Sequence, residues 1–232
     1  MADSRDADEL FWVEPQHRAI IPLDRFHVSR SLDRRLRSGR FSVTRDRAFG
    51  DVIRGCADRA ETWINGDIEH ATLALHASGH AHSIDVWNDE GALVGGVYGV
   101  KLGRAFFGES MFSRATDASK VALAWLVARM KVGGFRLLDA QFMTNHLASL
   151  GAVSVSRETY VGLLGAAVST GVSGSGGGGA VPAGASAPVS AIGNDEFSPD
   201  FFALDRLLEA TGAAGAAAPA GKIIAQLLGQ TS

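Results

Sequence analysis

Two polar residues at a spacing of two stand near the end of an otherwise apolar segment. Asp139 and Gln141 lie in residues 135–142, which the apolar run predicts to be a strand. Because side chains alternate along a strand, both residues should project from one face. A carboxylate placed in this way can orient an amine or accept its proton. The alternative is structural, since an aspartate near a strand end often caps a neighbouring turn.

A third polar residue, Glu109, follows an apolar stretch and has large apolar neighbours. These neighbours are Phe106, Phe107, Met111 and Phe112. Together they could line a pocket for a linear or aromatic group, because methionine adapts its shape to either. Plain core packing is the alternative for at least two of the four, and Glu109 alone could equally be a solvated turn residue.

The segment from residue 25 to residue 47 is strongly basic in a chain whose formal net charge is −3. With the adjoining Asp24 counted, it holds eight arginines against three aspartates, an excess of five positive charges. The arginines are Arg25, Arg30, Arg34, Arg35, Arg37, Arg40, Arg45 and Arg47. Such a cluster suits a nucleic-acid backbone, although a salt-bridged protein surface has the same composition.

The sequence disfavours several kinds of chemistry. It contains no Gly-x-Ser-x-Gly nucleophile elbow and no Walker loop for phosphate. His27, His80, His82 and His146 are not at metal-ligand spacing, so we expect hydrogen-bonded structural histidines and no metal. Cys56 is the only cysteine, which excludes an intrachain disulfide and favours a buried apolar role in a reducing cytosol.

The start of the chain and its hydropathy favour a cytoplasmic protein. Residues 1–9 are acidic and polar and lack the basic and apolar regions of a signal peptide. No uninterrupted apolar run approaches the roughly 20 residues that a membrane helix needs. We therefore expect a cytoplasmic location and no membrane contact.

Composition divides the chain into three regions. They are residues 1–66, expected to be a small N-terminal subdomain rich in Arg and Asp; residues 67–165, the most regular part; and residues 166–232, dominated by Gly, Ala, Ser and Pro. Within the last region, residues 169–191 are predicted to form a flexible linker. Residues 201–204 and 223–228 are apolar enough to dock back on the body.

Periodicity in the second region predicts helices that alternate with strands. Helices are expected over 68–78, 120–132 and 144–150, strands over 82–87, 92–100, 101–107 and 135–142, and a last element over 159–164. Thr116 or Asp117 can cap the 120–132 helix, which has a wide apolar stripe. The order indicates an α+β fold of the N-acetyltransferase type, a mixed sheet flanked by helices.

The junction before the 120–132 helix is unsuited to coenzyme A. In an acetyltransferase fold this junction usually holds the pyrophosphate of the cofactor at the helix N-terminus. Here residues 113–120 lack the glycines of a coenzyme A loop, and Asp117 adds a negative charge. The layout suggests acyl transfer, while the junction argues against coenzyme A as the donor.

Seven short motifs follow one another between about residue 11 and residue 164. They are His27-Val28-Ser29-Arg30-Ser31, Thr62-Trp63-Ile64, residues 80–87 (HAHSIDVW), residues 93–100 (LVGGVYGV), residues 108–113 (GESMFS) followed by Ala118-Ser119-Lys120, residues 138–141 (LDAQ) and residues 146–152 (HLASLGA). This series resembles the leucyl/phenylalanyl-tRNA–protein transferase family. One such motif would be weak, but seven in order leave little room for coincidence.

The resemblance implies an aminoacyltransferase. Its donor would be tRNA charged with Leu or Phe, with Met as a further candidate, and its acceptor a protein with N-terminal Arg or Lys. The product would be a new peptide bond and a degradation signal, made without metal or coenzyme. Relatives share the acetyltransferase-like fold, so residues 67–165 would be the catalytic domain. We expect a monomer whose partners are the aminoacyl-tRNA and the acceptor protein.

The resemblance also implies residue roles. Asp139 would orient Gln141, whose carbonyl oxygen would hold the attacking amine, and Asp139 could be either a base or a positioner. Glu109 would bind the 3′-terminal adenosine or the amino group of the donor. The other substrate-binding residues expected are Phe106, Ser110, Met111 and Phe112, with Trp63 stacked on the terminal base or packed over a domain seam. The tRNA-binding residues expected are Arg30, Arg34 and Arg35.

The chain departs from the family pattern at its start. Members carry a further upstream segment that ends in Gly-Ile-Phe-Pro, and Met1 stands about where that segment ends, so we expect an N-terminal truncation. Two other classes stay open. One is a different aminoacyl-tRNA-dependent peptide ligase, which usually carries two copies of the domain, and the other is a non-catalytic relative that binds tRNA or peptide.

Overall fold

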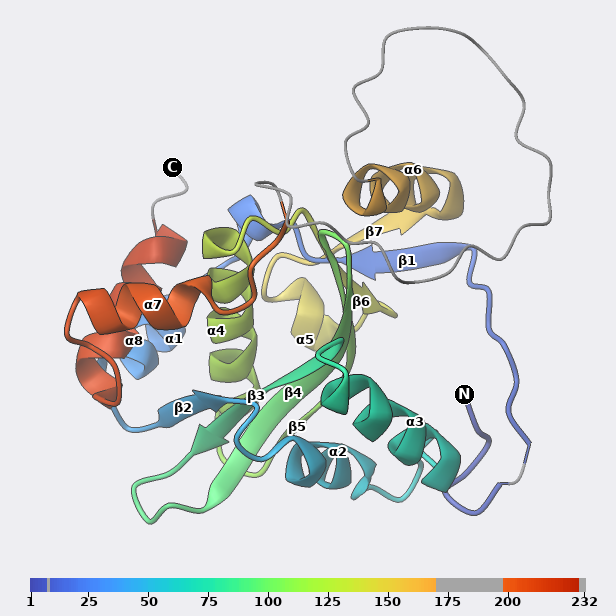
Figure 1. Ribbon diagram of the computed structural model, residues 1–232, viewed down its shortest axis with the longest axis horizontal. Coiled ribbons are helices and arrows are strands. Elements are labelled where there is room, and N and C mark those ends of the chain that lie inside the picture. The colour runs from blue at the N-terminus through green and yellow to red at the C-terminus, as the bar shows by residue number, and fades with distance from the viewer. Residues whose placement is uncertain (8, 170–197, 230–232) are drawn as a thin grey trace, which may run out of the picture.

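A seven-stranded mixed sheet runs through the part of the chain that the computed structural model describes, residues 1–7, 9–169 and 198–229 (Figure 1). The strand order is β2-β3-β4-β5-β6-β1-β7. The strands are β1 (His17–Ile20), β2 (Ser42–Arg45), β3 (Ala81–Trp87), β4 (Leu93–Leu102), β5 (Ala105–Ser113), β6 (Leu137–Gln141) and β7 (Val153–Ser156). Neighbours are antiparallel except β5 and β6, which are parallel. The predicted α+β class with a mixed sheet is confirmed.

Helices cover both faces of this sheet. They are the 3-10 helix η1 (Leu23–Arg25) and the α-helices α1 (Arg30–Arg37), α2 (Phe49–Ala57), α3 (Gly66–Ala77), α4 (Ala118–Val132), α5 (Asn145–Ala148), α6 (Arg157–Val168), α7 (Ala203–Ala210) and α8 (Ala217–Gly229). One face carries α4 with α1, α7 and α8, and the other carries α2, α3 and α6 (Figure 1). None of these helices is long and apolar enough to span a lipid bilayer.

The sheet extends into the first 66 residues. β1 lies between β6 and β7, and β2 forms the opposite edge beside β3. The sheet therefore runs across the boundary predicted at residue 66. β7 was not predicted from the sequence, because its four residues form no apolar run and are mostly exposed.

The start of α4 differs from the prediction. Asp117 precedes the helix in a left-handed conformation, with φ of 70°, and its side chain makes no capping hydrogen bond. The Ser119 amide instead donates to Ser113 Oγ at 3.2 Å. The Asp117 carboxylate pairs with Lys120 at 3.2 Å and with Arg35 at 3.6 Å, so it serves as an ionic partner of both cations.

A β-bulge interrupts the pairing of β4 with β5. Tyr98 lies opposite Ser110 while Gly99 lies opposite Gly108, which leaves Glu109 as the extra residue. The sequence predicted that this strand ends at residue 107, but β5 continues to Ser113. Side chains along β5 alternate between the two faces of the sheet, and the extra residue shifts this alternation by one position. Residues before and after Glu109 therefore do not alternate in one continuous pattern.

The C-terminal region returns to the face of α4. Phe201, Leu204 and Ile224 are each at most 1% exposed and belong to the main apolar cluster, as the composition of both stretches predicts. α7 packs on α4, and α8 packs on α1 and α4 (Figure 1). From residue 170 onward, the predicted linker lies outside the described residues.

Candidate active site

Glu109 and Gln141 meet where the two parallel strands part. β5 and β6 pair at three positions, the last of which joins Phe107 and Asp139. Beyond that point a side-chain contact bridges the strands, with Gln141 Nε2 donating to Glu109 Oε2 at 2.7 Å. Because the amide nitrogen is committed to Glu109, the amide oxygen is the atom of Gln141 that can accept a hydrogen bond from a substrate.

Asp139 holds Gln141 through the backbone. Asp139 Oδ1 accepts the Gln141 backbone N–H at 2.7 Å. Gln141 has a φ of 65°, a left-handed conformation that costs a non-glycine residue on the order of 1–3 kcal/mol. The hydrogen bond from Asp139 offsets this strain and fixes the direction of the Gln141 side chain.

The Asp139 carboxylate is enclosed by donors. Its side chain is fully buried, and Oδ2 accepts a hydrogen bond from Tyr160 Oη at 2.7 Å and pairs with the Arg18 guanidinium. Burial, together with the Asp139 hydrogen bond, raises the pKa of Tyr160, so the phenol remains a proton donor. Asp139 therefore has no surface with which to touch a substrate.

Two residues of this network, Arg18 and Tyr160, were missed by the sequence analysis. Arg18 lies in β1 and Tyr160 in α6, and the Arg18 guanidinium lies 5.1 Å from the centre of the Tyr160 ring. Arg18 is 121 residues away from Asp139 in the chain. The one available signal was a lone arginine in the strand-like stretch His17-Arg18-Ala19-Ile20.

Glu109 is the carboxylate of the site that reaches the surface. It is half-buried, and desolvation raises the pKa of its carboxyl group, assisted by the negative charge of Asp139, while the hydrogen bond from Gln141 opposes the rise. A carboxylate with a raised pKa accepts a proton more readily near neutral pH than an ordinary one. The position of Glu109 in the bulge directs it toward Gln141.

The apolar residues predicted to line a pocket lie on both faces. Phe106, 1% exposed, and the half-buried Met111 pack on the α4 face. Phe112, 8% exposed, packs under α2 on the opposite face. Without the bulge at Glu109, Phe106 and Phe112 would share a face, so the bulge is what brings Phe106 and Met111 together.

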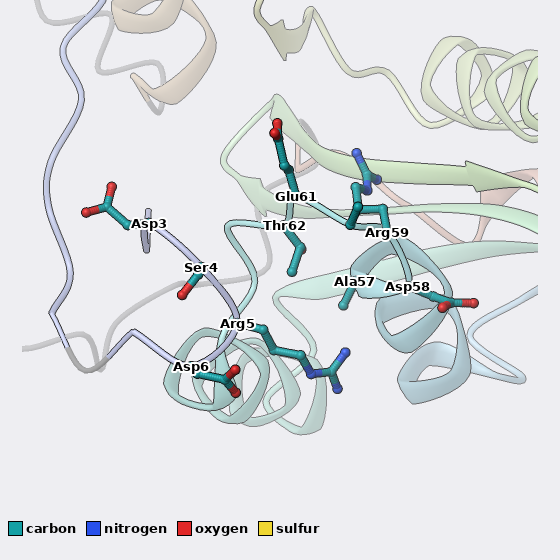
Figure 2. Close-up of a pocket in the computed structure, with 10 residues that line it drawn as sticks. Asp3, Ser4, Arg5, Asp6, Ala57, Asp58, Arg59, Glu61 and Thr62 are labelled. Carbon is teal, nitrogen blue, oxygen red and sulfur yellow. The ribbon is translucent and has the colours of Figure 1, made fainter.

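Ser110 is anchored by an arginine that the sequence analysis did not single out. Arg59 donates to Ser110 Oγ at 3.0 Å and to the Met111 carbonyl at 3.2 Å. Arg59 also lines a cavity of about 540 Å³ between residues 3–6 and the loop after α2 (Figure 2). Both acidic and basic side chains line this cavity, and Thr62 is its last lining residue in the chain. The next residue, Trp63, is half-buried and packs against the buried apolar residues of α2.

The three arginines expected at tRNA lie on α1 and are not equivalent. Arg35 is engaged, since its guanidinium pairs with Asp117 and lies 5.8 Å from the centre of the Phe41 ring. Arg30 and Arg34 are exposed, and in the described ranges no carboxylate forms an ion pair with either. In the described residues, Arg30 and Arg34 are therefore available to bind a phosphate, whereas Arg35 is part of the fold.

The four histidines considered for metal binding do not gather in one place. His82 Nδ1 donates to the Asp46 carboxylate at 2.8 Å, and the His80 ring contacts Ser78 Oγ at 3.0 Å. Among the residues that the structure describes, no group of three or more His, Cys, Asp or Glu side chains is placed to hold a metal ion.

The geometry defines a class of site. The buried carboxylate of Asp139 positions the amide of Gln141 beside a second carboxylate, that of Glu109, where β5 and β6 part. Residues 20–165 match the model of the family described as leucyl/phenylalanyl-tRNA protein transferase. The chain belongs to this family.

Named relatives agree with the family match. A leucyl/phenylalanyl-tRNA–protein transferase of Rhizorhabdus wittichii is 56% identical over 242 residues, covering 100% of this chain and 92% of that protein. One from Zymomonas mobilis is 59% identical, and the match covers 73% of this chain and 65% of that protein. One from Ruegeria pomeroyi is 60% identical, and the match covers 69% of this chain and 76% of that protein. Among solved structures, L-PGS from Bacillus licheniformis aligns with 58% of this chain and 50% of its own at 15% identity and a TM-score of 0.40.

Proposed function

We propose that this protein transfers Leu or Phe from aminoacyl-tRNA to the N-terminal Arg or Lys of acceptor proteins, forming a peptide bond. The observation that carries the proposal is the contact of Gln141 with Glu109, fixed by Asp139, in a chain of this family. We further propose an N-acetyltransferase-type catalytic domain over residues 67–165, in a monomeric, cytoplasmic enzyme.

The reaction is aminolysis of an ester. The neutral α-amine of the acceptor attacks the carbonyl carbon of the aminoacyl ester, a C–N bond forms, and the C–O bond to the ribose of the terminal adenosine breaks. One proton leaves the amine and one arrives at the ribose oxygen. The enzyme must place the amine and stabilise the oxyanion, because proximity accounts for much of the rate in such a step.

Gln141 is the residue that we assign to the amine. Its amide nitrogen donates to Glu109, so its amide oxygen can accept a hydrogen bond from the attacking N–H. Holding the amine in this way aims the nitrogen lone pair at the ester carbonyl. Asp139 acts as a positioning residue, because it is buried and reaches the substrate only through the backbone of Gln141.

Glu109 is suited to take the proton. Burial raises the pKa of its carboxyl group toward the range in which general bases work. Its contact with the Gln141 amide places the carboxylate next to the amine that Gln141 holds. The same carboxylate could instead contact the amino group of the donor, since both groups approach the gap between β5 and β6.

The donor side chain would enter the α4 face of the sheet. Phe106 and Met111 lie there beside Leu138, on the two strands that carry Glu109 and Gln141. Burial of an apolar side chain of Leu or Phe size against such residues contributes about 1.5–3 kcal/mol. The methionine can adjust to a linear or an aromatic side chain.

The tRNA acceptor stem would contact α1. Arg30 and Arg34 are the free cations there, while Arg35 is paired with Asp117. Arg34→Ala should lower the slope of log binding constant against log salt concentration by about 0.9 for each phosphate that the protein no longer neutralises. An unchanged slope in a salt titration would exclude this surface.

A transfer assay tests the proposed function. The protein is incubated with tRNA carrying labelled Leu or Phe and with two peptides that differ only in an N-terminal Arg or Ala. We expect label on the Arg peptide and not on the Ala peptide, and none from acetyl-coenzyme A. Transfer from acetyl-coenzyme A without transfer from tRNA contradicts the proposal, and so does tRNA binding without any transfer.

A further inference from the structure

Phe201, from the segment that precedes α7, inserts into the core on the α4 face. It is 1% exposed. Its ring lies parallel to those of His82, at 4.2 Å, and Phe106, at 5.5 Å between centroids. It meets the ring of Phe135 edge-on at 6.1 Å. The family match ends at residue 165, so Phe201 adds an aromatic wall from outside the matched region.

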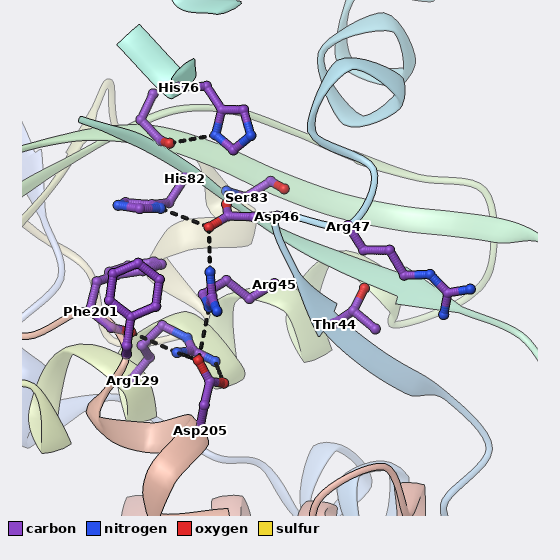
Figure 3. A network of polar contacts seen from close by, with 12 residues as sticks. Thr44, Arg45, Asp46, Arg47, His76, His82, Ser83, Arg129, Phe201 and Asp205 are labelled. Carbon is purple, nitrogen blue, oxygen red and sulfur yellow. Dashed lines mark hydrogen bonds and ion pairs between the residues drawn. The ribbon is translucent and has the colours of Figure 1, made fainter. Parts of the chain in front are cut away.

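A buried ionic network holds Phe201 in place (Figure 3). Arg129 of α4, 2% exposed, donates to the Phe201 carbonyl at 2.6 Å and to both oxygens of Asp205, at 2.6 and 2.9 Å. The Asp200 backbone pairs with Gly133 at 2.9 Å. Among the described residues, Asp205 is the one carboxylate that forms an ion pair with Arg129. Because a buried guanidinium needs this partner, the segment that carries Phe201 and Asp205 is held in a fixed position.

The network continues to the far side of Phe201. Arg45 Nε donates to Asp205, and another nitrogen of the same guanidinium donates to Asp46, each at 2.8 Å. Asp46 in turn contacts His82 Nδ1 at 2.8 Å (Figure 3). His82 thus supports one face of the Phe201 ring from a fixed position.

Phe106 connects this aromatic stack to the proposed donor pocket. It lies opposite Leu138 in the register of β5 and β6, three residues before Glu109 and Gln141 on the respective strands. Met111 lies on the same face, beyond the bulge. On this face β5 therefore carries Phe106 before the bulge and Met111 after it, and Phe201 stacks on Phe106.

We propose that Phe201 closes the inner end of the donor side-chain pocket and so determines which aminoacyl groups are accepted. This inference rests on the proposed function, since it assigns a limit to the same pocket. The ring of Phe201 fixes the position of Phe106, which sets the depth available to the side chain of the donor. The C-terminal segment that begins at Phe201 is then part of the specificity apparatus.

The proposal predicts opposite changes for smaller and larger side chains at this position. Phe201→Leu removes the ring that backs Phe106, so the pocket becomes deeper and transfer of Phe rises relative to Leu. Phe201→Trp adds volume and should favour Leu over Phe. One extra or missing methylene group in an apolar pocket changes discrimination by roughly 10- to 200-fold, and we expect the lower part of this range because Phe201 acts through Phe106.

The experiment is a competition between tRNA charged with labelled Leu and tRNA charged with labelled Phe, for one peptide with N-terminal Arg. The ratio of the two products is independent of the folded fraction, because both donors compete for the same active molecules. Phe202→Leu is the matched control. Phe202 is 40% exposed, and its ring meets those of His82 and Phe201 edge-on, at 5.7 and 6.4 Å, without a ring contact to Phe106.

The expected result is a product ratio that moves in opposite directions in Phe201→Leu and Phe201→Trp and stays at the wild-type value in Phe202→Leu. Unchanged ratios in both Phe201 variants, with transfer still measurable, would overturn the inference and leave the proposed function intact. Absence of transfer of both amino acids by the unaltered protein would instead overturn the proposed function.

Discussion

Two buried ionic networks lie on opposite faces of the sheet, and they end differently. On the α6 face, Asp139 gathers the Arg18 guanidinium, the Tyr160 hydroxyl and the backbone amide of Gln141. The last member, Gln141, is half-buried and its side chain contacts Glu109 at the gap between β5 and β6. This network therefore ends at a surface that a substrate can reach.

On the α4 face, Asp205 joins two arginines, Arg129 and Arg45, and Arg45 leads on to Asp46 and His82. His82 is 3% exposed, and Phe201 covers its ring at 4.2 Å. The His82 end of this network is therefore covered, and there it fixes a segment of the fold. Its other members, Arg45, Arg129 and Asp205, line a separate cavity of about 480 Å³.

Similar interactions thus serve different roles in the two networks. Each network holds a non-glycine residue in the left-handed region, Gln141 at φ of 65° and Asp46 at φ of 58°. In each, hydrogen bonds to a carboxylate offset the backbone strain. The exposure of the last residue in each network decides its role. Gln141 is reachable and can position a substrate, whereas His82 is covered and anchors the fold.

The largest effect is expected from Gln141→Ala, which removes the end of the first network. Single-turnover transfer should slow by roughly ten- to a thousandfold, the range for one positioning or acid–base group. The melting temperature should stay near that of wild type, because Asp139 keeps its contacts with Arg18 and Tyr160. A transfer rate near wild type in Gln141→Ala would show that the first network, like the second, only supports the fold.

Asp205→Ala should have the opposite signature. It leaves the buried Arg129 guanidinium without its carboxylate, which costs on the order of 3 kcal/mol. Chemical denaturation should show this loss, with transfer of Leu per folded molecule close to normal. Replacing the pair by Arg129→Met and Asp205→Leu should recover part of the stability, since apolar residues need no ionic partner. Full stability in Asp205→Ala would show that the segment does not depend on this pair.

Glu109→Gln tests the open end of the first network through pH. Burial raises the pKa of Glu109, so the folded state binds this proton more tightly than the unfolded chain does. The resulting stabilisation is complete below the ordinary carboxyl pKa and is lost as pH rises through the raised value. Glu109→Gln should therefore be more stable than wild type at neutral pH while transferring more slowly.

The control for this experiment is the acid limb of the pH–rate profile. Wild-type activity should rise with pH as the Glu109 carboxyl group ionises, and this rise should be absent in Glu109→Gln. An unchanged acid limb in the variant would assign the titration to another group.

The smallest effect is expected from Arg45→Ala, at the bridge within the second network. The Arg45 side chain is 24% exposed, so its ion pairs with Asp46 and Asp205 contribute up to about 1 kcal/mol. Unfolding in urea should show a smaller loss than in Asp205→Ala. A loss as large as that of Asp205→Ala would mean that the network acts as one unit rather than through the Arg129 pair.

The regular elements near the site were predictable from the sequence because their signals are local. The apolar stripe and the Gly133–Gly134 stop of α4, and the alternation of β3, place both elements within a few residues of their observed ends. The motif pair of Asp139 and Gln141 was also visible, although its geometry was not. Alternation predicted a shared face, whereas Gln141 leaves the strand conformation at φ of 65°.

The remaining features depend on pairing between distant segments. The bulge at Glu109 arises from the register of β5 against β4, which one strand's composition does not determine. Arg18 joins Asp139 only because β1 inserts between β6 and β7. Phe201 was expected to dock, but its partners His82 and Phe106 lie on separate strands far away in the chain.

The most direct test of the central claim is a double-mutant cycle at Asp139 and Gln141. Single-turnover transfer and thermal unfolding are measured on Asp139→Ala, Gln141→Ala and the double variant. If Asp139 acts only by holding Gln141, the rate of the double variant is barely below that of the slower single variant, because residues that act as a unit are not additive. Rate losses that multiply, or near-normal rates in both single variants, would contradict the account.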